Sequence, residues 1–285
     1  MRLMQWLTSR YWLRWVVLML FTVWIVIDWT STTSRSLLCK IRSEELSSLV
    51  WSHRGHVKPY PDASSEATNY LTSIGIHHFD VDVIFVRDDN GADSFYISHP
   101  TMFVASNREQ HITITDFLDN VFSVVSASAV QVTLEPKWDD QRVFTSFVQL
   151  VNDHTFAAKC AIIVRRKSEV LILESYGPKL VVAIPLRSSG IKPGDLWDPI
   201  KTEISFWPER SRVILMPDVK LLSLHPTLID SFEKGVSLVF WIVDDFEILR
   251  QVLQRGGGRR ISYISNQPEL LLELLLKNYQ AECKR

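Results

Sequence analysis

The sequence predicts an α/β fold, a (β/α)8 TIM barrel preceded by an N-terminal transmembrane helix. Three observations lead to this prediction. Eight short apolar segments follow one another after residue 45, helical segments lie between several of them, and a long uncharged segment precedes them all. We therefore divide the 285 residues into a membrane anchor over 1–30, a serine- and threonine-rich linker over 31–45, and the barrel over 46–285.

The anchor is predicted from its hydrophobicity and its length. Residues 15–27 carry no charge, and the mostly apolar stretch 11–29 is long enough to span a bilayer at about 1.5 Å per residue. A cleaved signal peptide is the alternative, but no clear small-residue cleavage site follows the apolar core. Basic residues flank both ends, so the positive-inside rule is close to a tie. Because the large domain follows the first apolar segment, we expect a single-pass membrane protein with that domain on the non-cytoplasmic side.

The barrel strands are predicted from short runs rich in apolar residues. Most runs are too continuous in apolar residues for a sheet with one face in water, and they suit parallel strands that are buried on both faces. The expected strands span 49–53, 78–83, 129–135, 161–164, 180–184, 212–216, 236–243 and 261–265.

Helices are predicted where apolar residues recur at helical spacing, over 64–74, 114–125, 244–255 and 268–279. The third begins with acidic residues and ends before a run of glycines, and the fourth begins with proline, which are typical helix start and stop signals. The alternation of strands and helices favours a closed parallel barrel. An open doubly wound sheet is the alternative, but no GxGxxG motif follows the first strand to indicate a dinucleotide fold.

Charge and cysteine content argue against two classes of function. The formal net charge is −1, and there is no basic stripe or aromatic platform, so we expect no nucleic-acid partner. The three cysteines, Cys39, Cys160 and Cys283, are odd in number and lack metal-ligand spacing. We therefore expect neither a cysteine metal site nor a disulfide framework. Protein partners cannot be inferred from these features.

Polar side chains gather at the C-terminal ends of the predicted strands, where TIM barrels place their chemistry. They comprise two histidines, an arginine, a lysine and three carboxylates. His53 and Arg54 end the first strand, Asp80 and Asp82 lie on the second, Glu135 and Lys137 end the third, and His99 follows a short extension after the second.

This set of side chains suits metal-assisted phosphate chemistry. Asp80 and Asp82 lie two residues apart on a strand, so both point to one face, where they repel each other unless a cation or a proton intervenes. Glu135 would complete an all-oxygen site that suits Mg²⁺ or Ca²⁺. Arg54 offers a planar fork for a phosphate, and histidines serve acid–base chemistry near neutral pH. Each feature alone is more often structural, so the hypothesis depends on their joint placement.

These motifs resemble those of the glycerophosphodiester phosphodiesterase family, which belongs to the phospholipase-C-like phosphodiesterase superfamily of TIM barrels. The segment SHRGH at 52–56 resembles the family's HRG signature, and Asp80-Val81-Asp82 falls at the place of its E-x-D metal pair. Glu135-Pro136-Lys137 resembles its E-x-K strand, and His99 resembles its second catalytic histidine. Residues 240–243 resemble the family's late strand, and residues 265–268 resemble the start of its closing helix.

The resemblance implies a barrel phosphodiesterase that hydrolyses a glycerol-linked phosphodiester, either a soluble glycerophosphodiester or a lysophospholipid. It also implies a role for each residue. His53 and His99 would be the acid–base pair, Arg54 and Lys137 would bind the phosphate, and Asp80, Asp82 and Glu135 would hold one divalent cation, Mg²⁺ or Ca²⁺.

Several positions depart from the family pattern. Asp80 replaces the usual glutamate, Pro100 replaces the aspartate after the second histidine, and Ala63 replaces the carboxamide of the family's PENT-like turn. The segment DDNGAD at 88–93 predicts a hairpin insertion. The compact middle of the chain is also similar to menorin-like and sphingomyelinase-D-type barrels. A catalytically degenerate barrel that binds a ligand or partner without turnover is therefore the alternative function.

Overall fold

The computed structural model describes residues 39, 43–87, 91–104, 111–124, 131–177, 180–187, 213–224, 228–232, 236–255 and 261–283. The predicted anchor over 1–30 lies outside these residues, as does most of the predicted linker. Among the helices of the described ranges, none combines the length and the apolar character that a membrane crossing requires. The anchor and the division of the chain into three parts therefore stay predictions.

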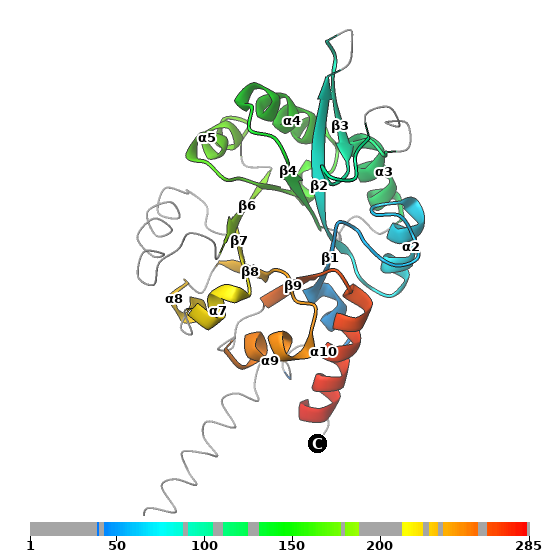
Figure 1. The fold of residues 1–285 in the computed structure, drawn as a ribbon, viewed down its shortest axis with the longest axis vertical. Coiled ribbons are helices and arrows are strands. Elements are labelled where there is room, and N and C mark those ends of the chain that lie inside the picture. The colour runs from blue at the N-terminus through cyan, green and yellow to red at the C-terminus, as the bar shows by residue number, and fades with distance from the viewer. Residues whose placement is uncertain are drawn as a thin grey trace, which may run out of the picture.

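Parallel strands close into the predicted barrel (Figure 1). Each strand pairs with the next along the chain, apart from a hairpin strand, and the last returns to pair with the first through Trp51 and Ile264. The strands of the ring are β1 (Val50–His53), β2 (His78–Arg87), β4 (Gln131–Pro136), β5 (Cys160–Ile163), β6 (Val181–Leu186), β7 (Val213–Pro217), β8 (Ser237–Phe240) and β9 (Ile261–Ser265).

The remaining strand, β3 (Asp93–Ile97), forms the predicted hairpin insertion. It pairs antiparallel with the second half of β2, from Val83 to Arg87, so β2 continues beyond the predicted range 78–83. The Ser98 backbone N–H then donates to the carbonyl of Asp82, at 3.1 Å. The hairpin thus returns the chain to the end of the ring just before His99.

Helices cover the outside of the ring (Figure 1). Polar residues start several of them: the Ser64 hydroxyl accepts from the Ala67 N–H at 3.1 Å, and the Asp140 carboxylate accepts from the Arg142 N–H at 2.7 Å. The α-helices are α2 (Ser65–Ser73), α3 (Ile114–Val124), α4 (Gln141–Asp153), α5 (Lys167–Ser175), α7 (Lys220–Leu224), α8 (Leu228–Ser231), α9 (Phe246–Arg255) and α10 (Pro268–Cys283). Of these, α2, α3, α9 and α10 correspond to the predicted helices.

Two hydrophobic clusters separate the inside of the ring from its outside. The larger cluster contains Phe79 and Val81 of β2 together with buried residues of the helices, so it lies between strands and helices. The smaller cluster fills the ring interior and consists of Trp51, Ala161, Ile163, Ala183, Ile214, Met216, Val239 and Ile264. Side chains alternate between these clusters along each strand, which determines the residues that point inward.

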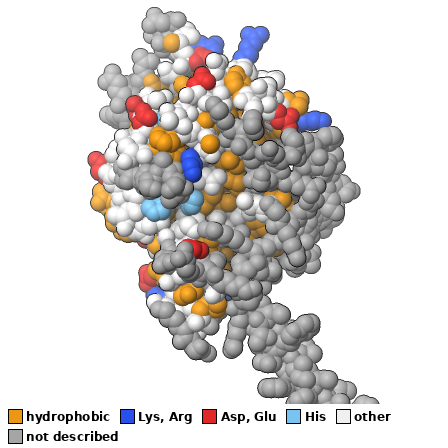
Figure 2. All heavy atoms as spheres, turned by 180° about the vertical axis from the view of Figure 1, so that it is seen from behind, with side chains coloured by type: hydrophobic (Ala, Val, Ile, Leu, Met, Phe, Trp, Pro, Cys, Tyr) orange, Lys and Arg blue, Asp and Glu red, His pale blue; other side chains and the backbone are white. Residues whose placement is uncertain are grey.

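Apolar side chains are also exposed on the surface, scattered among charged and uncharged ones (Figure 2). Met102 and Val104 are 56% and 51% exposed and lie in the segment that follows β3. This segment also contains His99, so an apolar surface lies close to one of the candidate catalytic residues.

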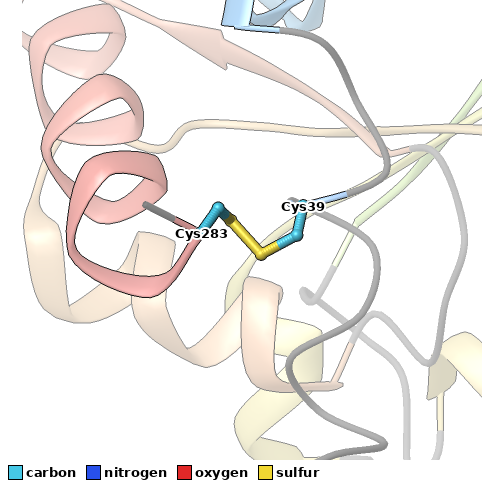
Figure 3. Close-up of a disulfide and its surroundings, with 2 residues drawn as sticks. All are labelled: Cys39 and Cys283. Atoms are coloured by element: carbon cyan, nitrogen blue, oxygen red, sulfur yellow. A yellow bond between two sulfur atoms is a disulfide. The ribbon is translucent and has the colours of Figure 1, made fainter. Parts of the chain in front are cut away.

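A disulfide joins Cys39 to Cys283, which corrects the prediction that the cysteines form no disulfide framework (Figure 3). The two residues are 244 positions apart in the sequence, so no local spacing of cysteines indicates that they pair. They meet because the 3-10 helix η2 (Ser43–Leu49) packs against α10 at the start of the ring. Cys160 is free and buried.

Candidate active site

Strand register brings the predicted residues together at one end of the ring. His53 is the Cα partner of Asp80 in the β1–β2 pair, and Asp82 is the partner of Glu135 in the β2–β4 pair. Asp80 and Asp82 alternate with Val81, which packs on the outer side of the strands. The two aspartates therefore point inward, and both are buried.

His53 is held in one orientation by Asn266. Its Nδ1 lies 2.7 Å from the Asn266 Oδ1, and its Nε2 lies 3.9 Å from Asp80 Oδ2. Burial lowers the pKa of His53 below its ordinary value, although the hydrogen bond to Asn266 acts in the opposite direction. The lowered pKa favours the neutral form of His53, and its Nε2 faces the carboxylate of Asp80.

Asp244 fixes the orientation of the Asn266 amide, and the sequence did not predict that either residue contacts the site. The Asn266 Nδ2 donates to Asp244 Oδ2 at 2.6 Å, and the Asn266 backbone N–H donates to Asp244 Oδ1 at 2.8 Å. Because the amide nitrogen faces a carboxylate, its oxygen must face His53 and accept the Nδ1–H. The proton of neutral His53 is thus placed on Nδ1, and Nε2 keeps its lone pair.

Arg54 follows His53 in a tight left-handed turn. Arg54 and Gly55 have φ values of 60° and 59°, and a Cβ at Gly55 would lie 3.0 Å from the Ala63 Cα. The Arg54 N–H donates to the carbonyl of Asp80, while its Nε lies 3.3 Å from Asp82 Oδ2 without forming an aligned hydrogen bond. The guanidinium thus lies beside the carboxylates and retains donors for an anion.

Three cations contact Glu135. Lys137 Nζ lies 2.6 Å from Glu135 Oε2 and 2.7 Å from Asp82 Oδ1, so it bridges the two carboxylates. Arg165 and Arg187 both approach Glu135 Oε1, at 2.7 Å and 3.5 Å. Burial alone would raise the pKa of Glu135, but the charge and hydrogen bond of Lys137, followed by those of Arg165, lower it below its ordinary value. Glu135 is therefore held ionised.

Asp80 is in the opposite electrostatic situation. Burial, followed by the negative charges of Glu135 and Asp82, raises the pKa of Asp80 well above its ordinary value. Its Oδ1 is buried without a hydrogen-bond partner, and so is Asp82 Oδ2. A site that leaves two carboxylate oxygens in this state is incomplete, since buried acceptors in proteins are normally satisfied.

His99 is placed near this cluster by the backbone of the hairpin but does not join it. Its Nδ1 lies 2.7 Å from the Thr101 hydroxyl, and its carbonyl accepts from the N–H groups of Met102 and Phe103. In the part of the chain that the structure describes, no hydrogen bond or ion pair connects the His99 ring to the other predicted site residues. The structure thus brings six of the seven together by direct contacts.

The donor set fits a hard divalent cation, although the side chains are not arranged around one. Among the described residues, no three His, Cys, Asp or Glu side chains form a cluster that could hold a metal ion. Lys137 occupies the space between Asp82 and Glu135 that a shared cation would take. The Asp80 and Asp82 oxygens that lack a hydrogen bond are nevertheless the hard ligands that Mg²⁺ and Ca²⁺ prefer, so the chemistry of the site fits such an ion.

Comparison with known proteins gives a result at the level of the fold. No protein-family model matches the sequence, and no curated protein matches it. Solved structures do match. A glycerophosphodiester phosphodiesterase from Parabacteroides distasonis has a TM-score of 0.62 and 17% identity, covering 81% of this chain and 98% of that one.

Two further structures extend this likeness. A glycerophosphodiester phosphodiesterase from Agrobacterium tumefaciens has a TM-score of 0.51 and 14% identity, over 79% of this chain and 97% of that one. A phosphodiesterase from Oleispira antarctica, solved with its product sn-glycerol-3-phosphate, has a TM-score of 0.55 and 10% identity, over 79% and 96%. At these identities the comparison establishes the barrel fold that the chain shares with them.

Proposed function

We propose that this chain, which has the barrel fold of the glycerophosphodiester phosphodiesterases, is a phosphoric diester hydrolase that cleaves a glycerol-linked phosphodiester. One observation carries the proposal. His53 presents a neutral Nε2 to a buried cluster of carboxylates and cations at the C-terminal end of the ring, where TIM barrels place their chemistry.

In this proposal each residue has a defined task. His53 accepts a proton from the attacking oxygen through Nε2, and His99 protonates the leaving oxygen once the substrate draws the hairpin segment inward. Arg54 and Lys137 bind the phosphoryl oxygens, Arg54 through its free guanidinium donors and Lys137 as a point charge. Asn266 and Asp244 keep the proton of His53 on Nδ1.

We further propose that Asp80, Asp82 and Glu135 hold one divalent cation, Mg²⁺ or Ca²⁺. Such an ion would polarise a phosphoryl oxygen. The support is the pair of buried oxygens on Asp80 and Asp82 that lack a hydrogen bond. Lys137 would have to leave its bridge between Asp82 and Glu135 and turn towards the substrate phosphate.

The substrate class follows from the surroundings of the site. A glycerophosphodiester needs only the polar cluster, whereas a lysophospholipid also needs an apolar contact, which exposed Met102 and Val104 beside His99 could supply. We propose these two classes as substrates. A membrane anchor over 1–30 would keep the domain near lipid, and the disulfide is consistent with a non-cytoplasmic location because disulfides persist in oxidising compartments.

A catalytically degenerate barrel is the second candidate function. Two observations favour it: Lys137 bridges Asp82 and Glu135, and the His99 ring bonds Thr101 and makes no contact with the cluster among the described residues. Such a protein would bind an anion at Arg54 and Lys137 without turning it over.

Hydrolysis assays on the full chain distinguish the two functions. The panel contains glycerophosphocholine, glycerophosphoinositol, lysophosphatidylcholine and sphingomyelin, each with Mg²⁺, Ca²⁺ or EDTA. Cation-dependent hydrolysis of a glycerol ester supports the enzyme and identifies its class. A folded chain that hydrolyses none of the panel, and whose thermal stability responds to neither ion, would favour the degenerate barrel.

A further inference from the structure

We propose that Arg165 and Arg187 form a second anion subsite, which selects substrates whose leaving group carries an additional phosphate. The inference rests on the proposed hydrolase function and specifies its substrate. Neither arginine belongs to the motifs that suggested the chemistry; Arg165 lies in a basic run after β5, and Arg187 directly follows β6.

Strand alternation places both arginines at inward positions of the ring. Ile163 of β5 and Ala183 of β6 are Cα partners, and both belong to the cluster that fills the interior. Arg165 lies two residues beyond Ile163, and Arg187 lies four residues beyond Ala183, so both continue the inward face. They extend the ring of site residues from β4 to the next two strands.

Among the residues that the structure describes, the contacts of the two arginines leave most of their guanidinium N–H donors without a partner. Arg165 Nη2 lies 2.7 Å from Glu135 Oε1, and Arg187 Nη2 lies 3.5 Å from the same oxygen. Their side chains are 30% and 53% exposed. A guanidinium carries five N–H donors in a planar fork that matches phosphate, and one shared oxygen cannot satisfy two such groups. Both guanidinium groups can therefore donate hydrogen bonds to a further anion.

The backbone of Arg165 is fixed, so its side chain projects from a defined point. Glu169 of α5 is buried, and its Oε2 accepts the N–H of Arg165 at 2.6 Å and that of Arg166 at 3.2 Å. The next residue along, Arg166, instead pairs with exposed Asp139 at 2.6 Å. Arg166 is thus a neighbouring arginine whose guanidinium contacts Asp139 and not Glu135, and it supplies a matched control.

The site carries more positive charge than one phosphodiester group neutralises. Four cationic side chains contact Asp82 and Glu135, namely Arg54, Lys137, Arg165 and Arg187. With the proposed divalent cation bound, the site holds six positive charges, whereas Asp80, Asp82, Glu135 and a phosphodiester group together bring four negative ones. A second phosphate on the substrate would compensate the surplus, with Arg165 and Arg187 as its ligands.

The test compares two esters that differ by one phosphate. We would measure kcat/KM of the full chain for glycerophosphoinositol and glycerophosphoinositol 4-phosphate, for wild type, Arg165→Ala, Arg187→Ala and Arg166→Ala. The wild type and Arg166→Ala should prefer the phosphorylated ester, and each subsite variant should reduce that preference by about tenfold. An equal loss on both esters would show that the arginines only support Glu135, and would overturn the inference.

A binding measurement separates this inference from the proposed function. If the wild type hydrolyses neither ester, the proposed function fails, and calorimetry with inorganic pyrophosphate tests the subsite alone. Weaker binding to both subsite variants than to wild type and Arg166→Ala would support it. Equal binding to all four proteins would contradict it.

Discussion

Asn266 Oδ1 lies 2.7 Å from His53 Nδ1, and this contact joins the end of the first strand of the ring to the residue just after its last strand. Closure of the barrel makes the contact possible, since β1 pairs directly with β9. The neutral tautomer of His53 therefore depends on a residue 213 positions away.

Replacing Asn266 should affect both the rate and its pH dependence. In Asn266→Ala the tautomer of His53 is no longer fixed, and we expect kcat to fall about 10- to 100-fold. The hydrogen bond raises the pKa of His53, so its loss should lower that pKa further. If neutral His53 is the base, the acid limb of the pH–rate profile then moves to lower pH.

Activity measured between pH 4.5 and 8 checks this prediction. Asn120→Ala serves as the control, because the Asn120 side chain donates to the Ser65 hydroxyl between α3 and α2, outside the candidate site. A reduced rate with an unchanged acid limb would mean that Asn266 does not act through His53.

Removing the charge of Asp80 should stabilise the protein when no divalent cation is present. The pKa of Asp80 is raised in the folded state. Its contribution to the free energy of unfolding is therefore fully present below its ordinary pKa of 3.8, and it is lost as the pH rises through the pKa of the folded state. Asp80→Asn has no such loss. In EDTA near pH 7 its Tm should exceed that of wild type by about 2–6 °C.

The same pair of proteins gives the control for Asp80. At pH 4 the two melting temperatures should converge, and added Mg²⁺ or Ca²⁺ should stabilise wild type more than the variant. A variant that is less stable than wild type in EDTA at pH 7 would contradict the assigned repulsion.

Lys137 should compete with a divalent cation for Asp82 and Glu135. Lys137→Met removes the bridging ammonium but keeps most of the apolar length of the side chain, so we expect its affinity for Mg²⁺ or Ca²⁺ to rise at least about tenfold. Calorimetric titration measures this affinity, with exposed Lys58→Met as the control. An unchanged or weaker affinity would show that Lys137 does not occupy the cation position.

Thiol counting should report one protected thiol and one disulfide. Burial raises the pKa of Cys160 to about 12, so this thiol should not react with Ellman's reagent at pH 8 while the protein is folded. We expect no reactive thiol in the native chain, one after unfolding without reductant, and three after unfolding with reductant. Three thiols without reductant would exclude the pair Cys39–Cys283.

The barrel and much of the site could be predicted because both depend on local patterns. Continuous apolar runs indicate buried parallel strands, and a spacing of two places Asp80 and Asp82 on one face. The roles assigned to these residues, to His99 and to the cation stay predictions.

Other features depend on closure of the ring, which no local pattern reveals. Asn266 and Asp244 come into contact with each other and with His53 only where the last strand meets the first. Arg165 looks like part of a solvated basic loop until strand register places it beside Glu135. The pair Cys39–Cys283 likewise requires the two ends of the fold to meet.

The central claim is that His53 performs phosphodiester hydrolysis, and one comparison tests it most directly. We would measure kcat of the full chain on its preferred ester with the preferred cation, for wild type, His53→Ala and His154→Ala, since His154 pairs with Asp119 of α3, outside the candidate site. The account predicts a loss of about a thousandfold or more in His53→Ala alone. Equal rates in His53→Ala and wild type would contradict it.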